Sequence, residues 1–218
     1  MKKAIVFDFD GVILESMDVK TRAFRDLFKD HPQYQDRIVQ FHLENGGMSR
    51  FEKFRIIYRD ILARPLPEDE FERLSGEFSQ LVVEEVLRCP FVPGTQKFLK
   101  KYSLVYDLFV ASGTPEAELR LIVRERNLTG FFRQVYGSPK EKSHILREIM
   151  ASNSYSPEDA VFVGDSKNDY DAALKASIPF VGRVPSGARN LFPEKGLLAV
   201  VQDLNELDRV WHTRVERL

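Results

Sequence analysis

The chain has 218 residues, 43% of them hydrophobic and 30% charged, and carries a net charge of −1 at pH 7. This composition predicts a globular protein with a buried core, and the balanced charge argues against nucleic acid or a membrane surface as a partner. No apolar run reaches the ~20 residues that span a bilayer, an apolar run begins directly after Lys3, and Cys89 is the single cysteine. We therefore expect a cytoplasmic protein without a signal peptide or an internal disulfide.

The first predicted element is a strand over residues 4–7, where an uninterrupted apolar run is typical of a strand buried on both faces of a parallel sheet. It ends in two carboxylates, Asp8 and Asp10, and Gly11 lets the chain turn away. Ligands of open α/β sheets bind at this end of a strand. Two neighbouring carboxylates repel each other unless a cation neutralises them, and Mg²⁺ prefers oxygen ligands. The pattern favours a Mg²⁺ site over a simple polar turn.

Residues 17–89 have helical periodicity and no strand pattern. Ser49, followed three residues later by Glu52, predicts a capping box at the start of one helix. Acidic residues at 68–70 open another helix that should end near residue 88. An all-helical insertion between two strand-forming regions predicts a cap over the end of the first strand.

From residue 90 onward, predicted strands alternate with helices, which indicates βαβ units and a parallel sheet with helices on both faces. We expect strands over residues 104–111, 134–136, 160–163, 179–182 and 198–201. The expected helices cover residues 95–101, 115–127, 143–151 and 204–218, and one more helix follows the strand at 160–163 and ends at residue 176. Thr114 is expected to cap the second of these helices, and Trp211 to pack on the core. The fold class is thus α/β, with a Rossmann-like core of residues 1–16 and 90–218 and an inserted helical cap of residues 17–89.

Polar residues suited to binding phosphate or metal follow the main strands. Besides Asp8 and Asp10, they are Ser112, Gly113, Thr114, Lys140, Lys142, Asp165 and Asp169. The carboxyl ends of parallel strands lie at one edge of a sheet, so we expect these residues to converge on one site.

The chemistry that fits this set is phosphoryl transfer. An aspartate is ionised at neutral pH, so Asp8 can attack phosphorus without a base. Mg²⁺ between Asp8, Asp165 and the phosphate would remove the repulsion, while Ser112, backbone N–H groups and a lysine bind phosphate oxygens. Asp10 can protonate the departing alcohol and then deprotonate the attacking water.

These residues resemble the motifs of the haloacid dehalogenase-like (HAD) superfamily. In chain order the four motifs are Asp8-Phe9-Asp10-Gly11-Val12, Ser112-Gly113-Thr114, Lys142 or Lys140, and Gly164-Asp165-Ser166-Lys167-Asn168-Asp169. The helical insertion is similar in place to that family's C1-type cap. The spacing before the helix at 143–151 favours Lys142 over Lys140.

The resemblance implies Mg²⁺ dependence and an aspartyl-phosphate intermediate. It implies that Asp8 is nucleophile and metal ligand, and that Asp10 is acid/base and a ligand through its backbone carbonyl. It also implies that Asp165 is a metal ligand and that Asp169 supports a water or the lysine.

Asp10 favours phosphate-ester hydrolysis, because relatives that cleave carbon–halogen bonds usually lack this second aspartate. The expected substrate is a small phosphorylated metabolite, as for phosphoglycolate phosphatases; the oligomeric state is unknown from the sequence. A sugar phosphomutase similar to β-phosphoglucomutase is the alternative, because Gly47-Met48-Ser49-Arg50 resembles the loop in which that group binds a second phosphate. Lys20, where that group has histidine, and the Gly-Asp start of the fourth motif favour the phosphatase.

Arg50 and Lys20 are candidates for recognising an anionic substrate tail, with plain surface charge as the other interpretation. The four histidines fall at no metal-ligand spacing, and we expect them on the surface or in packing. A non-catalytic phosphate-binding or regulatory module on the same fold stays open as a further alternative.

Overall fold

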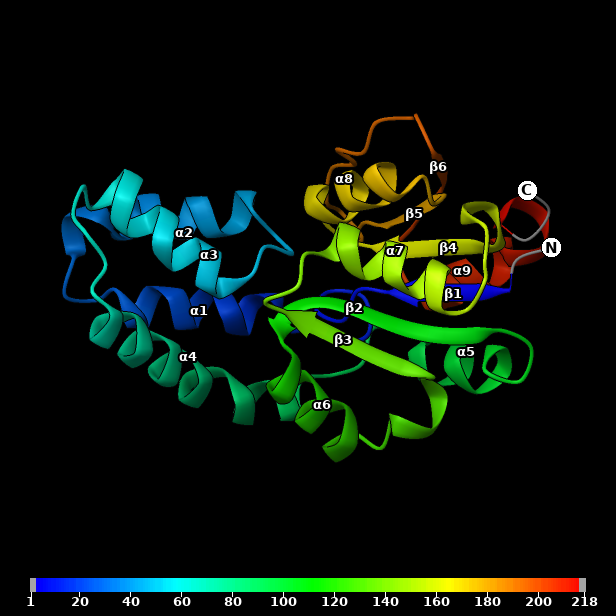
Figure 1. The fold of residues 1–218 in the computed structure, drawn as a ribbon, viewed down its shortest axis with the longest axis horizontal. Coiled ribbons are helices and arrows are strands. Elements are labelled where there is room, and N and C mark those ends of the chain that lie inside the picture. The colour runs from blue at the N-terminus through cyan, green and yellow to red at the C-terminus, as the bar shows by residue number, and fades with distance from the viewer. Residues whose placement is uncertain (1–2, 216–218) are drawn as a thin grey trace.

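The computed structural model describes residues 3–215 and contains a six-stranded sheet in the order β3-β2-β1-β4-β5-β6 (Figure 1). Every neighbouring pair of strands is parallel. The strands are β1 (Ala4–Phe7), β2 (Asp107–Pro115), β3 (Gln134–Ser138), β4 (Ala160–Gly164), β5 (Phe180–Arg183) and β6 (Leu197–Val201). The predicted α/β class is confirmed, and the end of β1 lies between the ends of β2 and β4.

Side chains of β1 pack alternately into two apolar layers on opposite faces of the sheet. Ile5 and Phe7 belong to one hydrophobic cluster, whereas Ala4 and Val6 belong to the other, and all four are fully buried. This explains why β1 is apolar at every position rather than at alternate ones. The first layer includes α5 (Thr95–Tyr102), α6 (Glu116–Glu125) and α9 (Leu204–Val210), and the second α7 (Lys142–Ser152) and α8 (Lys167–Ala176).

Residues 8–94, all of which the structure describes, contribute no strand to the sheet. Their helices lie beyond the carboxyl ends of the strands (Figure 1). They are α1 (Met17–Leu27), a 3-10 turn (Pro32–Tyr34), α2 (Gln35–Glu44), α3 (Arg50–Ile56), a π-helical turn (Ile57–Ile61) and α4 (Glu68–Arg88). We call these helices the cap helices; that they form a separate domain of residues 17–89 stays a prediction.

The strand expected over residues 104–111 instead spans Asp107–Pro115. Asp107 pairs with Ala4, the first residue of β1, so the residues before it extend past the sheet. Leu104 and Val105 are accordingly 85% and 70% exposed. Pairing with β1, rather than the local apolar run, sets where β2 begins.

Two capping interactions that we expected from the sequence are absent. Ser49 is the N-cap residue of α3, as expected, but its buried hydroxyl makes no capping bond and has no hydrogen-bond partner among residues 3–215. Thr114 does not cap α6, whose N-cap is Pro115, because its hydroxyl donates to Asp10 instead. At Thr114 a contact with a distant segment thus overrides the local capping preference.

The last predicted helix, over residues 204–218, appears as α9 followed by a π-helical turn (Trp211–Val215), and residues 216–218 lie outside the described part. Trp211 is fully buried against Phe98, Tyr102 and Tyr106, as expected.

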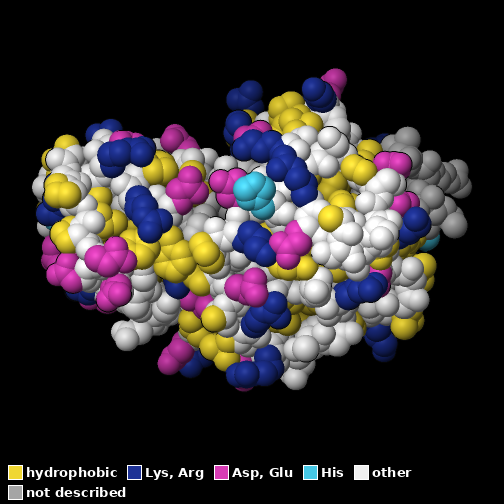
Figure 2. Space-filling view, viewed as in Figure 1, with side chains coloured by type: hydrophobic (Ala, Val, Ile, Leu, Met, Phe, Trp, Pro, Cys, Tyr) yellow, Lys and Arg dark blue, Asp and Glu magenta, His cyan; other side chains and the backbone are white. Residues whose placement is uncertain are grey.

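Basic and acidic side chains are both spread over the face of the molecule in Figure 2. Among the helices of residues 3–215, none has the length and apolar character required to cross a membrane.

Candidate active site

Four charged side chains converge beyond the ends of β1 and β4. Asp8 follows β1, Asp165 follows β4, Asp169 lies in the first turn of α8, and Lys142 begins α7. One oxygen from each of the three carboxylates lies within 4.8 Å of one from each of the others. Lys142 Nζ lies 2.9 Å from Asp8 Oδ2 and 2.5 Å from Asp169 Oδ1. The sheet therefore brings together residues from three separate motifs.

This cluster has more negative than positive charge. Burial, followed by repulsion from Asp169, raises the pKa of Asp8 well above its usual range and raises that of Asp165 to about 7. Burial opposes the charge of Lys142, but Asp169 and Asp8 outweigh it and raise the pKa of that lysine. A further cation would relieve the repulsion among the carboxylates. Because every potential ligand is a carboxylate oxygen, a hard divalent cation fits this site best.

Asp169 uses both of its carboxylate oxygens within the protein. Oδ2 accepts hydrogen bonds from the backbone N–H and the hydroxyl of Ser166, at 3.1 and 2.5 Å, and Oδ1 accepts from Lys142. The carboxylate thus closes the capping box of α8 and holds the lysine. Asp8 and Asp165 are left as the carboxylates better placed to bind a cation.

Asp10 has a different set of partners from Asp8. Its carboxylate accepts hydrogen bonds from Ser16 at 2.6 Å, Thr114 at 2.8 Å and Lys20 at 2.5 Å. Burial alone would raise the pKa of Asp10, but Lys20 and the two hydroxyls outweigh it and lower the pKa. The two neighbouring aspartates are therefore perturbed in opposite directions.

The Ser112–Gly113 segment of β2 lies at the same edge of the sheet. Ser112 is fully buried, with Oγ 3.5 Å from Asp10 Oδ2. At Gly113 the loop before α3 comes so close that a Cβ would lie 2.5 Å from the carbonyl oxygen of Gly47. Here the absence of a side chain permits a close approach between two backbones.

Of the two candidate lysines, only Lys142 lies in the cluster. Lys140 is exposed and pairs with Glu148 at 2.6 Å. This geometry supports Lys142 as the phosphate-binding lysine.

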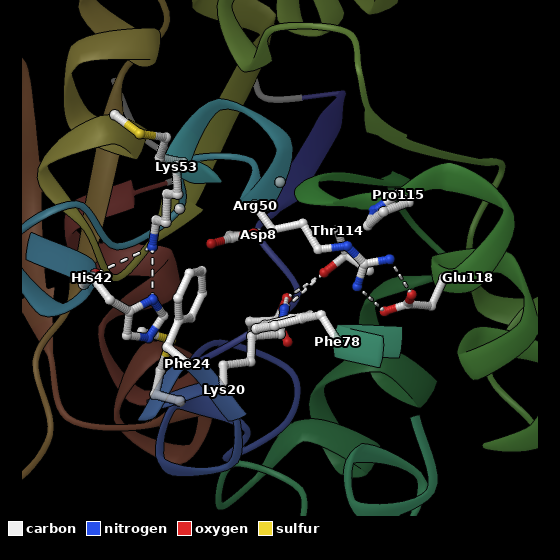
Figure 3. Close-up of a pocket in the computed structure, with 15 residues that line it drawn as sticks. Asp8, Lys20, Phe24, His42, Arg50, Lys53, Phe78, Thr114, Pro115 and Glu118 are labelled. Carbon is white, nitrogen blue, oxygen red and sulfur yellow. Dashed lines mark hydrogen bonds and ion pairs between the residues drawn. The ribbon is translucent and has the colours of Figure 1, made fainter. Parts of the chain in front are cut away.

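A pocket lies between the cap helices and the ends of β1 and β2 (Figure 3). It encloses about 480 Å³ not filled by atoms, part of it open to solvent. Asp8 and Asp10 line it from the sheet, and Lys20, Arg50 and Lys53 line it from the cap helices. The nucleophile candidate and three cations thus share one cavity.

Arg50 and Lys20 are held in place by carboxylates of the α/β part. Arg50 Nη2 lies 2.7 Å from Oε2 of Glu118 in α6 (Figure 3). It also donates to Ser79 in α4. The side chains of Arg50 and Lys20 are only 8% and 16% exposed. Neither residue is the solvated surface charge that was the other interpretation.

The sequence patterns do not point to Lys53, although it lines the pocket. Its Nζ lies 3.0 Å from Nδ1 and 3.1 Å from the carbonyl oxygen of His42, and both residues are 2% exposed. One signal was available: Lys53 follows Arg50 by three residues and precedes Ile57 by four, so it falls on the buried face of α3.

Arg183, at the end of β5, was also not identified. Its guanidinium binds the carbonyl oxygen of Gly11 at 3.1 Å and the carboxylate of Glu15 at 2.6 Å. It therefore supports the loop that carries Asp10, and no local pattern marks it.

Comparison with known sequences places these residues in a family context. Residues 5–183 match the family model of the haloacid dehalogenase-like hydrolases. Phosphoglycolate phosphatase 1 of Pseudomonas aeruginosa is 25% identical over 186 residues, which cover 82% of this chain and 68% of that protein. The phosphorylated carbohydrates phosphatase of Thermotoga maritima is 23% identical over 185 residues, covering 81% and 82%.

Solved structures share the fold along almost the whole chain. A HAD hydrolase of Bacillus subtilis, determined with magnesium bound, has a TM-score of 0.70 at 18% identity and covers 97% of this chain and 99% of its own. β-Phosphoglucomutase of Clostridium difficile has a TM-score of 0.75 at 18% identity, covering 97% and 96%. At such identities these structures show the fold alone.

Proposed function

The chain belongs to the haloacid dehalogenase-like hydrolase family, as its motifs predicted, and we propose that it is a Mg²⁺-dependent phosphomonoesterase for a small phosphorylated metabolite. The observation that carries this proposal is the meeting of Asp8, Asp165 and Lys142 in one largely buried cluster beside Asp10. The phosphatase names of the related sequences support the same reaction class.

We assign the metal to the carboxylates of Asp8 and Asp165 and the backbone carbonyl of Asp10. The fit rests on the excess negative charge of the cluster; burial, together with repulsion from Asp169, raises the pKa values of Asp8 and Asp165 above their usual range. When bound, Mg²⁺ would supply the positive charge that lets an ionised carboxylate approach a phosphate dianion.

In the first proposed step, a carboxylate oxygen of Asp8 attacks phosphorus, and the bond between phosphorus and the ester oxygen breaks. Lys142, together with the hydroxyl of Ser112 and the backbone N–H of Gly113, binds the phosphoryl oxygens. In the second step, water attacks phosphorus, phosphate leaves, and Asp8 is restored.

Asp10 is the proposed acid and base for these two steps. Its ion pair with Lys20 favours the ionised form, which is ready to accept a proton from the attacking water. The leaving alcohol needs a proton in the first step, which Asp10 supplies from its protonated form, the form that its ion pair with Lys20 disfavours. The proton that Asp10 takes from water in the second step restores that form, so the cycle balances.

A sugar phosphomutase is the second candidate, because Arg50 lines the pocket where a second phosphate would bind. The ion pair between Arg50 and Glu118 weighs against it, since the guanidinium is already neutralised by a carboxylate.

The test is phosphate release from para-nitrophenyl phosphate and a panel of phosphorylated metabolites, with Mg²⁺ and with EDTA. We expect release that requires Mg²⁺. A folded protein that binds Mg²⁺ but hydrolyses no ester would contradict the phosphatase. Adding a hexose bisphosphate would then distinguish a mutase, which would isomerise a sugar phosphate, from a non-catalytic module.

A further inference from the structure

Lys53 differs from the other two cations of the pocket in lacking an acidic partner. Lys20 pairs with Asp10 and Arg50 pairs with Glu118. Within residues 3–215, by contrast, no carboxylate lies within 4.0 Å of Lys53 Nζ, whose polar contacts are both with His42. A buried ammonium group without an anion is unfavourable, so it calls for an explanation.

The hydrogen bonds around Lys53 leave donors without acceptors. An ammonium group has three N–H bonds, and His42 accepts two of them. Burial, followed by the charges of Lys53 and Lys20, lowers the pKa of His42 to about 2, so its ring is neutral. Because Nδ1 accepts from Lys53, the ring hydrogen lies on Nε2, which is buried and has no partner in the described part of the chain.

Arg50 Nε is likewise buried without an acceptor among the described residues. The cap side of the pocket therefore contains unpaired hydrogen-bond donors beside the Lys53 amine, which has no acidic partner. A ligand rich in acceptors and negatively charged complements this surface.

We propose that Lys53, positioned by His42, binds an anionic group on the leaving-group end of the substrate and thereby determines specificity. The group is a carboxylate or a second phosphate. Lys53 reaches the pocket from α3 and Asp8 reaches it from the end of β1, so one small ester can contact both (Figure 3). The proposal rests on the proposed function, because the phosphoryl end must lie at Asp8.

The test compares three esters with Mg²⁺ present: 2-phosphoglycolate, which has a carboxylate; glucose 1,6-bisphosphate, which has a second phosphate; and ethyl phosphate, which has neither. In Lys53→Met, the ratio of kcat/KM for an anionic ester to that for ethyl phosphate should fall at least about tenfold, mainly through KM. The anionic ester whose kcat/KM falls more in Lys53→Met identifies whether Lys53 binds a carboxylate or a second phosphate. Lys29→Met, an exposed lysine of the cap segment, is the matched control and should keep the wild-type ratio.

Lys53→Arg separates a binding role from a structural one, because it keeps the charge. It should restore much of the preference for the anionic ester that Lys53→Met loses. Equal losses for all three esters in Lys53→Met would overturn the proposal, as would a wild-type enzyme with no preference for an anionic ester.

The pH dependence gives an independent readout. His42, Lys20, Lys142 and Asp10 are the groups that act on Lys53; burial, followed by Lys20 and Lys142, lowers the pKa of Lys53 to about 7, and only Asp10 opposes this. The preference for 2-phosphoglycolate should therefore decline above about pH 7 in the wild type and stay level in Lys53→Arg. A preference that is independent of pH in the wild type would count against Lys53.

A binding measurement that needs no turnover separates failure of the proposed phosphatase activity from failure of the Lys53 specificity site. In the Asp8→Asn background, calorimetry should show 2-phosphoglycolate binding at least about tenfold tighter than ethyl phosphate, and adding Lys53→Met should remove the difference. If this difference appears in a protein that hydrolyses nothing, the specificity site stands and the phosphatase does not. Equal binding of the two esters would overturn the specificity site itself.

Discussion

Lys53 shows how a binding residue can reduce the stability of the fold that contains it. The pKa of Lys53 in the folded protein is about 7, whereas the pKa of an exposed lysine is about 10.4. Between these pH values the unfolded chain binds a proton that the folded chain lacks, so stability rises with pH across this window. Below about pH 7 the folded protein carries the full unfavourable effect of a buried charge.

Lys53→Met should consequently increase the free energy of unfolding by about 1–3 kcal/mol at pH 6. The gain should shrink as the pH rises from 7 toward 10, because the folded wild type then contains a neutral amine and no longer buries a charge. Urea denaturation of both proteins at pH 6 and pH 9 measures this. A variant less stable than the wild type at pH 6 would show that Lys53 contributes net stability.

The residues that the sequence indicated in the α/β part share one property: each follows an apolar run that ends at the same edge of the sheet. Asp8, Ser112 and Asp165 could be selected in this way from single strands. Lys53 and His42 could not, because they lie on different cap helices and meet only when the helices pack. The catalytic roles of the selected residues stay predictions.

At the scale of elements, one buried ion pair joins α3 and α6. Arg50 and Glu118 are about equally inaccessible, with side chains 8% and 10% exposed. Removing one partner leaves a buried charge without its counterion, which destabilises more than the pair itself stabilises.

Glu118→Gln should therefore lower the free energy of unfolding by about 3 kcal/mol in urea denaturation. Glu125→Gln, at an exposed position of the same helix, is the control and should change it by less than about 0.5 kcal/mol. If the two variants had the same free energy of unfolding, the ion pair between Arg50 and Glu118 would not contribute to stability.

The loop before α3 meets β2 at Gly113, where a Cβ would lie 2.5 Å from a backbone oxygen of Gly47. Gly113→Ala should displace the loop from the phosphate-binding segment and lower kcat/KM at least about tenfold. Gly130→Ala is the matched control, because a Cβ there meets nothing within 4 Å. Steady-state kinetics measure both, and wild-type kcat/KM in Gly113→Ala would show that close approach of the loop is unnecessary.

Element bounds were predicted well where local chemistry decides them and poorly where pairing decides them. The helix of residues 68–88 begins after Pro67 with three acidic residues, and α4 spans that range. The start of β2 depends on its register with β1, which no local pattern contains. The Thr114 cap was missed for a similar reason, since its hydroxyl donates to Asp10, which is remote in sequence.

For the whole molecule, the alternation of apolar runs with helical periodicity was enough to predict a parallel α/β sheet. The packing of the cap helices on that sheet could not be predicted, because it depends on contacts between remote residues. Asn168 of α8, for example, donates a hydrogen bond of 2.7 Å to the carbonyl oxygen of Gly46. Such contacts define the pocket and hence the substrate.

Metal binding should affect the stability of the entire chain, because Asp8 and Asp165 follow two neighbouring central strands. Mg²⁺ should raise the melting temperature of the wild type relative to EDTA. In Asp165→Asn, Mg²⁺ should raise the melting temperature much less. In EDTA this variant should be more stable than the wild type, because one of the repelling carboxylate charges is gone. An equal Mg²⁺ increment in both proteins would place the metal elsewhere.

The central claim is that Asp8 becomes phosphorylated, and trapping the intermediate tests it most directly. The enzyme is mixed briefly with a hydrolysed ester and Mg²⁺, quenched in acid, reduced with borohydride and digested. We predict homoserine in place of Asp8 in the wild type, and in Asp8→Asn neither a trapped intermediate nor phosphate release. Phosphate release by Asp8→Asn at the wild-type rate, or a phosphoryl group trapped on another residue, would contradict the account.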